Sequence, residues 1–266
     1  MWTQIVGKTR MALSPAQNHW WHVPLYVTPR GLIAPGMYSG SLAFEAEFDF
    51  IAHELAIRTS EGTKAAVPLF ARSVADFYGE YMATLRSLGI EVRINRKPQE
   101  FDDNTPFDED RHHASYDREY VERFRRILIN VDFLLRRFRS AFLGKCSPVH
   151  FFWGSFDLAV TRFNGKPSPR AAMDPVTREA YSHEVISCGF WPGSRAFPHA
   201  AFYAYAAPAI PGLDEFPGWD TQLGEFILRY EDARTEPDPD RSVLDFCVRT
   251  YDAAAKLGRW DLSLIR

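Results

Sequence analysis

Histidine and acidic residues lie among aromatic residues in the second half of the chain, and this pattern is suited to proton transfer. His150 and Asp157 fall within the aromatic run 147–164, and His183 lies further along. Imidazole changes charge near neutral pH, and a neighbouring carboxylate can orient it as a general acid or base. We therefore take His150, His183 and Asp157 as candidate catalytic residues. The alternative is that each is a core side chain hydrogen-bonded to the backbone, and the sequence leaves both interpretations open.

A second set of residues is suited to holding a ligand. Two histidines flank two tryptophans in the run Asn-His-Trp-Trp-His at 18–22. Residues three apart on a strand point to opposite faces, so His19 and His22 are not expected to bind one metal ion together. One of them is expected to reach a pocket beside a tryptophan. The candidate ligand-binding residues are His19, Trp20, His22, Trp153, Tyr181 and Glu184.

The sequence contains none of the short motifs that identify common enzyme classes. It lacks G-x-S-x-G, a P-loop, the dinucleotide motif G-x-G-x-x-G, HExxH and clustered metal ligands. Cys146 and Cys188 have no neighbouring sequence that would activate a thiol. We therefore predict no cofactor and assign no metal ligand, and the sequence leaves open whether the protein is an enzyme.

Composition limits the classes of partner. The 266 residues are 46% hydrophobic and 15% aromatic, and the net charge of −3 provides no basic field for nucleic acid or an anionic membrane. No apolar run reaches the roughly 18 residues of a transmembrane helix, and the N-terminus does not resemble a signal peptide. Three cysteines without paired spacing indicate reduced thiols and a cytoplasmic protein. The expected partner is an unidentified small molecule, and a homo-oligomer stays open.

The first third of the chain alternates between strand patterns and one helix pattern. Residues 41–51 alternate apolar and acidic side chains, with Leu42, Phe44 and Phe48 expected to face inward. Ser73 is a typical N-cap for a helix that runs to Leu88 and stops at Gly89. Further strands are expected at 3–14, 20–34, 53–59, 65–70 and 90–95.

A polar segment and a long helix are predicted to interrupt the pattern. Residues 96–116 contain prolines, aspartates and two histidines, which is typical of a loop or a lid. Apolar residues then recur at helical spacing from Tyr120 to Phe142. The basic residues near the end of this helix, Lys145 included, suit its dipole and favour a structural role.

The second half returns to strands. The central run 147–164 is predicted to be one strand, with His150 and Asp157 on opposite faces unless a bulge intervenes. Asp174 and the proline after it are typical of the start of a short helix. Strands at 182–191, 200–207 and 223–230 and a helix at 241–257 complete the chain.

Three segments of the first half align with three of the second, in the same order. Residues 7–13 match 154–160, residues 53–61 match 224–232, and the helix at 73–88 matches 242–257. We therefore predict an α+β fold with antiparallel sheets built from two ββββα repeats and a long helix inserted between them. The expected division is 1–96 for the first repeat, 97–146 for the insertion and 147–266 for the second repeat, in one compact structural domain.

Three motifs resemble those of a bacterial family of uncharacterised proteins, a domain of unknown function. They are NHWWHVPLYVT at 18–28, SPVHFFWGSFDLAVTR at 147–162 and EAYSHEV at 179–185. The resemblance covers nearly the whole chain and implies no activity, so no catalytic residue follows from it. Members of the family begin further upstream, so a segment ahead of Met1 is expected.

These observations favour one hypothesis over two others. The first is a small-molecule-binding protein with an aromatic-lined pocket and histidine acid–base chemistry, the site lying at the seam between the two repeats. There, His150 and His183 are expected to share a cavity with a histidine of the 19–22 run. The alternatives are a non-catalytic interaction or oligomerisation protein and a metal-dependent hydrolase.

Overall fold

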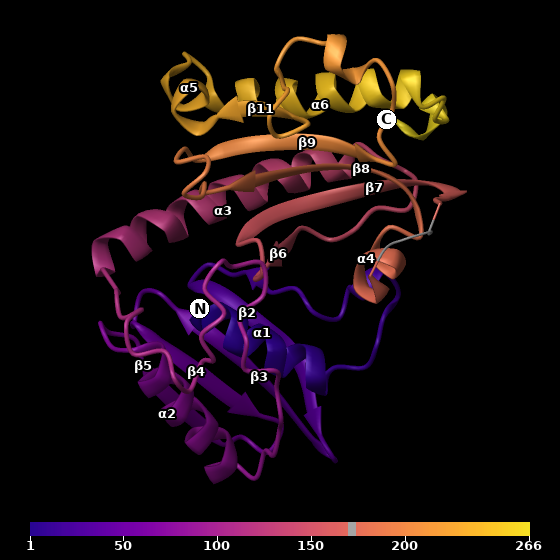
Figure 1. Ribbon diagram of the computed structural model, residues 1–266. Helices are drawn as coiled ribbons and strands as arrows, with labels where there is room; N and C mark the ends of the chain where they lie inside the picture. The colour runs from indigo at the N-terminus through magenta and orange to yellow at the C-terminus, as the bar shows by residue number, and fades with distance from the viewer. Residues whose placement is uncertain (170–173) are drawn as a thin grey trace. The chain divides into compact units, whose positions relative to one another are not determined.

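The computed structural model describes residues 1–169 and 174–266, which form two compact units (Figure 1). The first unit comprises Met1–Gln17, Trp21–Ile129 and Phe151–Ser155. The second comprises Asn18–Trp20, Asn130–His150 and Phe156–Arg266. Neither unit is a continuous stretch of chain.

The first unit contains a five-stranded antiparallel sheet whose strands are hydrogen-bonded in chain order. Its strands are β1 (Tyr26–Val27), β2 (Gly31–Ser39), β3 (Leu42–Asp49), β4 (Glu54–Thr59) and β5 (Lys64–Pro68). Phe44, Ala46 and Phe48 of β3 are buried, as the alternation predicts. Glu47 and Asp49 of the same strand, expected to face outward, are also buried. Their charges are compensated by ion pairs with Arg58 and Arg30, respectively.

The prediction of a strand at residues 3–14 is wrong, because Trp2–Leu13 forms helix α1. Ile5, Val6 and Thr9 are buried at helical spacing, and α1 lies against β2. The polar side chain of Arg10 is buried too, and its Nε donates a 2.8 Å hydrogen bond to the carbonyl oxygen of His22. Buried polar residues thus obscured the apolar stripe of this helix in the sequence.

The second helix of this unit begins where its cap predicts. Helix α2 spans Val74–Ser87, and the Ser73 hydroxyl accepts a hydrogen bond from the amide of Asp76. Gly89 follows with a φ of 73°, the left-handed conformation that commonly ends a helix. The expected strand at 90–95 is wrong, since these residues have no regular structure. Residues 96–116 are a loop, as predicted, apart from short turns.

The second sheet is antiparallel and has six strands, in the order β10-β11-β9-β8-β7-β6. They are β6 (His150–Phe152), β7 (Asp157–Pro167), β8 (His183–Trp191), β9 (Ala201–Ala207), β10 (Trp219–Asp220) and β11 (Glu225–Arg229). The single strand predicted at 147–164 is wrong, because a turn separates Phe152 from Asp157. Phe156 in that turn has a φ of 62°. The turn-forming pair Gly154-Ser155 lies between aromatic residues that favour a strand, so the sequence pattern hides the turn.

Helices precede, separate and follow these strands in the chain. The predicted long helix is α3 (Arg118–Ser140), the capped short helix is α4 (Pro175–Ala180), and α5 (Tyr230–Thr235) precedes α6 (Pro239–Leu257). Figure 1 shows α6 running along β9. Cys188 and Phe202 of the sheet and Cys247 of α6 are buried there. Among the described residues, no helix is long and apolar enough to cross a bilayer.

A buried cation lies in the core of the second unit. The Arg162 guanidinium lies 3.6 Å from the ring centre of Phe138 and 4.3 Å from that of Tyr251. It also donates a hydrogen bond to the carbonyl oxygen of Phe138. Aromatic faces stabilise a desolvated guanidinium by cation–π attraction, so this arginine acts as a core residue.

The α+β class with two antiparallel sheets is confirmed. Each unit contains four neighbouring antiparallel strands followed later in the chain by a helix, namely β2-β3-β4-β5 with α2 and β7-β8-β9-β11 with α6, although β10 intervenes in the chain between β9 and β11. One aligned pair differs in type, since residues 7–13 lie in α1 while 154–160 form a turn and the start of β7. Duplication of a ββββα repeat, and the domain division drawn from it, stay predictions.

Candidate functional site

A row of polar side chains crosses one face of the second sheet. Thr161 on β7 pairs with Ser187 on β8, which pairs with Tyr205 on β9. The hydroxyl oxygens of Thr161 and Ser187 are 3.0 Å apart, and the Tyr205 hydroxyl is 2.7 Å from that of Tyr181. Strand alternation places this row on the face opposite to Arg162 and Cys188, which pack with α6. One face of the sheet is therefore apolar core, and the other carries hydroxyl groups.

Asp157 and Tyr203 form a buried pair on the same polar face. The Tyr203 hydroxyl donates a hydrogen bond to the Asp157 carboxylate. The Tyr203 ring lies over Gly189, where a Cβ atom would come within 2.4 Å of the ring. Burial and the charge of Asp157 raise the pKa of Tyr203 well above its usual value. The phenol therefore stays protonated and acts as a donor.

Glu225 adds a titratable carboxyl group to this face. It directly precedes Phe226, which pairs with Ala204, so the antiparallel register sets Glu225 beside Tyr205. Burial, and then the negative charge of Asp157, raise the pKa of Glu225 to about 7. A carboxyl group with this pKa can donate or accept a proton near neutral pH.

His19 is held between a lysine and a backbone carbonyl. It lies in the short helix η1 (Asn18–Trp20) with a φ of 58°. Its Nδ1 donates to the carbonyl oxygen of Ala180 at 3.1 Å, and its Nε2 accepts from Lys145 Nζ at 2.7 Å. The imidazole packs on Phe163, with ring centres 4.6 Å apart. These contacts fix the tautomer with hydrogen on Nδ1.

His183 and Ser182 complete a basic cluster. The ring centres of His19 and His183 are 5.6 Å apart. Ser182 Oγ lies 3.0 Å from His183 Nδ1 and 3.4 Å from His19 Nδ1, so one hydroxyl serves both imidazoles. Burial, followed by the charges of Lys145 and His183, lowers the pKa of His19, and the hydrogen bond to Ala180 opposes this shift. Burial also lowers the pKa of Lys145.

The basic cluster and the polar row are joined through consecutive residues. Tyr181 bonds to Tyr205 of the row, while Ser182 and His183 belong to the cluster. His183 and Ser187 are four residues apart on β8 and therefore share a face of the strand. The arrangement gathers imidazole, ammonium, phenol and carboxyl groups on one side of the sheet.

The predicted site residues are distributed over both units. His19 and His183 meet in the basic cluster, Tyr181 bonds to Tyr205 of the polar row, and Asp157 binds Tyr203. Glu184 lies on the opposite face of β8 and accepts a hydrogen bond from Asn164.

The remaining candidates are His22, Trp153, Trp20 and His150. Their contacts do not test the roles predicted for them. In the first unit, His22 Nδ1 accepts from the amide of Gln17 at 3.2 Å, and Trp153 Nε1 donates to the carbonyl oxygen of Val23 at 2.9 Å. Trp20 follows His19 in η1 with a φ of 60°. His150 begins β6 in the second unit and is 1% exposed. A cavity shared by His150 and His183 stays a prediction.

Several residues of this site were not candidates from the sequence. The sequence favours a helix-dipole role for Lys145, yet Lys145 binds His19, which is 126 positions away. Tyr203 and Tyr205 lie in the strand predicted at 200–207. Their separation by two residues on a strand placed them on one face, but only the register of β9 with β8 shows which polar residues they meet. Glu225 gave no signal beyond its place in a strand.

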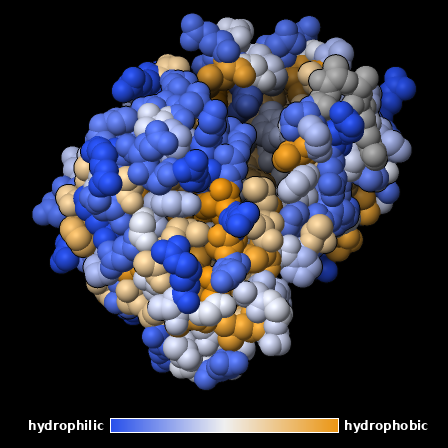
Figure 2. Space-filling model, turned by 60° about the horizontal axis from the view of Figure 1, so that its bottom comes forward, coloured by the Kyte–Doolittle hydropathy of each residue, from blue (hydrophilic) through white to orange (hydrophobic). Residues whose placement is uncertain are grey.

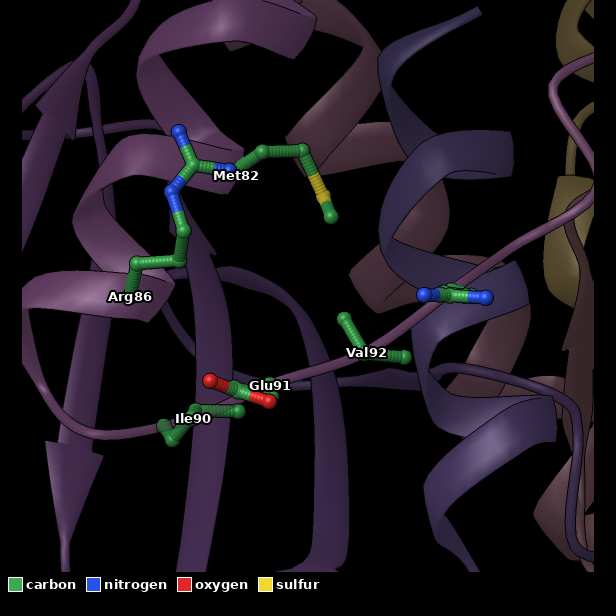
Figure 3. Close-up of a pocket in the computed structure, with 6 residues that line it drawn as sticks. Met82, Arg86, Ile90, Glu91 and Val92 are labelled. Carbon is green, nitrogen blue, oxygen red and sulfur yellow. The ribbon is translucent and has the colours of Figure 1, made fainter.

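A separate pocket lies in the first unit, at the end of α2. It has a volume of about 390 Å³ and is lined by Met82, Arg86, Ile90, Glu91, Val92 and Arg93. Figure 3 shows that these residues come from α2 and the segment that follows it. The lining contains no imidazole, thiol or hydroxyl group, so it offers no nucleophile and only one carboxylate for proton transfer.

The chain belongs to a family of unknown function, DUF5996, whose family model matches residues 1–266. The family resemblance seen in the three sequence motifs is therefore confirmed. No curated protein and no solved structure matches the chain. Function must be argued from the site itself.

Proposed function

We propose that this protein binds a small molecule bearing a carboxylate or phosphate group and acts on it by histidine acid–base chemistry. The observation that carries this proposal is the contact of 2.7 Å between Lys145 Nζ and His19 Nε2, beside His183 and Ser182. Here a buried imidazole, a second imidazole, an ammonium group and a hydroxyl converge within one unit.

The electrostatics of the cluster favour an anion. Burial lowers the pKa of both His19 and Lys145, because their charged forms lose hydration there. The positive charges of Lys145 and His183 lower the pKa of His19 further. An anion placed against these groups would reverse both effects, so its binding should be coupled to proton uptake. The Ser182 hydroxyl can serve as an additional hydrogen-bond donor to it.

Two kinds of titrating group support proton transfer at the site. His19 is an imidazole whose pKa lies below its usual value, and it is oriented by fixed hydrogen bonds. Glu225 titrates at a pKa of about 7 on the same face of the sheet. General acid–base catalysis requires groups that can take up and release a proton near the working pH, and Glu225 is such a group. We also propose a cytoplasmic location, supported by the three free cysteines.

The test is a binding screen with matched variants. The full chain is titrated with a panel of small carboxylates and phosphate monoesters by thermal shift and calorimetry. A ligand at about a hundred times its dissociation constant should add roughly 2.7 kcal/mol to the free energy of unfolding. Lys145→Met and His183→Gln should each weaken binding at least about tenfold. Lys166→Met, which changes an exposed lysine of β7, is the control.

Two results would overturn the proposal. One is that no anion in the panel binds, while uncharged analogues do. The other is that a bound anion keeps wild-type affinity in both Lys145→Met and His183→Gln. Far-UV circular dichroism of each variant establishes that it is folded before its affinity is compared.

A non-catalytic interaction protein is the second candidate. Figure 2 shows hydrophobic residues gathered in the lower half of the face in view. On α3, Tyr120 is 66% exposed and Phe133 is 56% exposed, so an interface that covered them would bury apolar surface. A stable oligomer in light scattering that dissociates in Phe133→Ser would favour this candidate. A metal-dependent hydrolase also stays a prediction.

A further inference from the structure

The loop at 96–116 in the first unit brings together residues that bind metals. One ligand atom from each of Asp103, His112 and His113 lies within 4.8 Å of the others. Asp103 Oδ2 is 2.7 Å from His112 Nε2, and the two imidazole ring centres are 4.2 Å apart. The three residues are close enough for one ion to contact all of them.

A fully buried carboxylate organises this cluster. Asp110 is 0% exposed, and its Oδ1 accepts from the amides of His112 at 3.2 Å and His113 at 3.0 Å. Asp110 Oδ2 is 2.9 Å from His113 Nδ1, and Oδ1 is 3.4 Å from His112 Nδ1. A carboxylate that holds Nδ1 of a histidine leaves Nε2 as its metal-binding nitrogen. Asp110 therefore orients the imidazole of His113 through a hydrogen bond and fixes His112 through its backbone amide.

Asp103 is fixed through one oxygen only. Its Oδ1 accepts from the amide of Thr105 at 2.8 Å and from the Thr105 hydroxyl at 2.7 Å. Its Oδ2 is the atom that meets His112. A carboxylate held in this way presents its second oxygen at a defined position, as a metal ligand requires.

The loop that carries the cluster is fastened to α2. The carbonyl oxygens of Asp110 and His113 accept from the amides of Ala75 at 2.9 Å and Val74 at 3.0 Å, in the first turn of the helix. Phe107, in the middle of the loop, is fully buried. The cluster therefore has a rigid base, while the His112 side chain is 57% exposed and gives an ion access from solvent.

We propose that Asp103, His112 and His113 bind a divalent transition-metal ion, best Zn²⁺, with Asp110 as the carboxylate that holds both histidines. Two imidazoles and one carboxylate suit Zn²⁺ and its first-row neighbours, whereas Ca²⁺ and Mg²⁺ prefer oxygen ligands throughout. The donor atoms around a tetrahedral Zn²⁺ ion lie about 3.4 Å from one another. Side-chain rotations that move the donor atoms by about 1 Å are therefore enough to reach that spacing. Three protein ligands leave the fourth position for water or a ligand.

Calorimetry with Zn²⁺ alone tests the site on tag-free, chelator-stripped full-length protein. The wild type should bind one equivalent, and Co²⁺ should give visible absorption bands typical of nitrogen and oxygen ligands. His112→Ala and Asp103→Asn should each weaken binding at least about tenfold, and Asp110→Asn about 10–100-fold. His199→Ala, which removes an exposed histidine in the second unit, should change nothing.

The proposal is overturned if the wild type shows no saturable Zn²⁺ binding. It is also overturned if His112→Ala and Asp103→Asn both retain wild-type affinity, since the ion would then bind elsewhere. Circular dichroism checks the fold of each variant, and His112→Ala alters an exposed side chain, so it is expected to fold even where Asp110→Asn does not. The readout is binding, so it is independent of the anion site proposed for the second unit.

Discussion

Glu225 is the residue whose titration most directly links the polar face to pH. Its pKa of about 7 in the folded protein is above the value of 4.5 for an unperturbed glutamate. The folded state therefore binds the proton more tightly, so this group's stabilising contribution is complete below about pH 4.5 and is lost as pH rises to about 7. Glu225→Gln cannot ionise and should lose less stability over that range.

Urea unfolding at pH 5 and pH 8 measures this effect. The difference in free energy of unfolding between the two pH values should be smaller in Glu225→Gln than in the wild type. Glu61→Gln, in an exposed turn of the first unit, is the control and should behave as the wild type does. Equal pH dependence in Glu225→Gln and wild type would show that Glu225 does not titrate as described.

The cysteine thiols are expected to react slowly in the folded protein. Burial raises the pKa of Cys146 to about 11, and burial is also the main reason that the pKa of Cys188 is well above its usual value. At pH 8, a thiol of that pKa is about one part in a thousand thiolate, which is the reactive form. A thiol-specific reagent should therefore react slowly with the native protein and rapidly once it is unfolded. Fast reaction of the native Cys146 would contradict this.

At the residue level, the sequence singles out His19 and His183 as candidates but not the residues that lie beside them. His19 and His183 were candidates because imidazole beside aromatic residues is chemically suggestive. They are 164 positions apart, and only the fold sets their rings 5.6 Å from each other. The sequence favours a helix-dipole role for Lys145, because its positive charge fits that role as well as it fits a place beside His19.

At the scale of elements, Gly189 on β8 makes room for the Tyr203 ring. A Cβ atom there would lie 2.4 Å from the ring and 2.6 Å from the carbonyl oxygen of Leu158. Gly189→Ala should therefore displace Tyr203 from Asp157 and destabilise the protein by about 1–3 kcal/mol. Denaturant unfolding measures the loss, and Gly165→Ala is not a suitable control because its φ is 82°.

A suitable control is Ala206→Gly on the neighbouring strand β9, which removes a methyl group and should cost about 1 kcal/mol or less. If Gly189→Ala unfolds at the same denaturant concentration as the wild type, the packing of Tyr203 on β8 is not as described.

Elements with strong local signals were predictable, and elements defined by distant contacts were not. Ser73 and Asp174 cap helices as expected, because side-chain caps act within three residues. Helix α1 was predicted as a strand because Gln4, Lys8 and Arg10 interrupt its apolar stripe. These polar residues are buried through bonds to distant backbone, such as Gln4 to Gln99 at 2.9 Å.

At the scale of the whole molecule, each unit includes a short segment whose flanking residues belong to the other unit. Asn18–Trp20 belongs to the second unit and Phe151–Ser155 to the first, although the residues on either side of each belong to the other unit. Both segments lie inside motifs that the sequence singled out. A contiguous division of the chain could not anticipate this exchange, because local composition carries no signal for it.

The central claim is that an anionic small molecule binds against His19 and Lys145. The most direct measurement is nuclear magnetic resonance of the imidazole groups, with pH titrations in the presence and absence of an anion found in the binding screen. Burial and neighbouring positive charge lower the pKa of His19, so a bound anion should raise it. If the anion binds and the titration of His19 does not move, the ligand lies elsewhere and the proposed site is wrong.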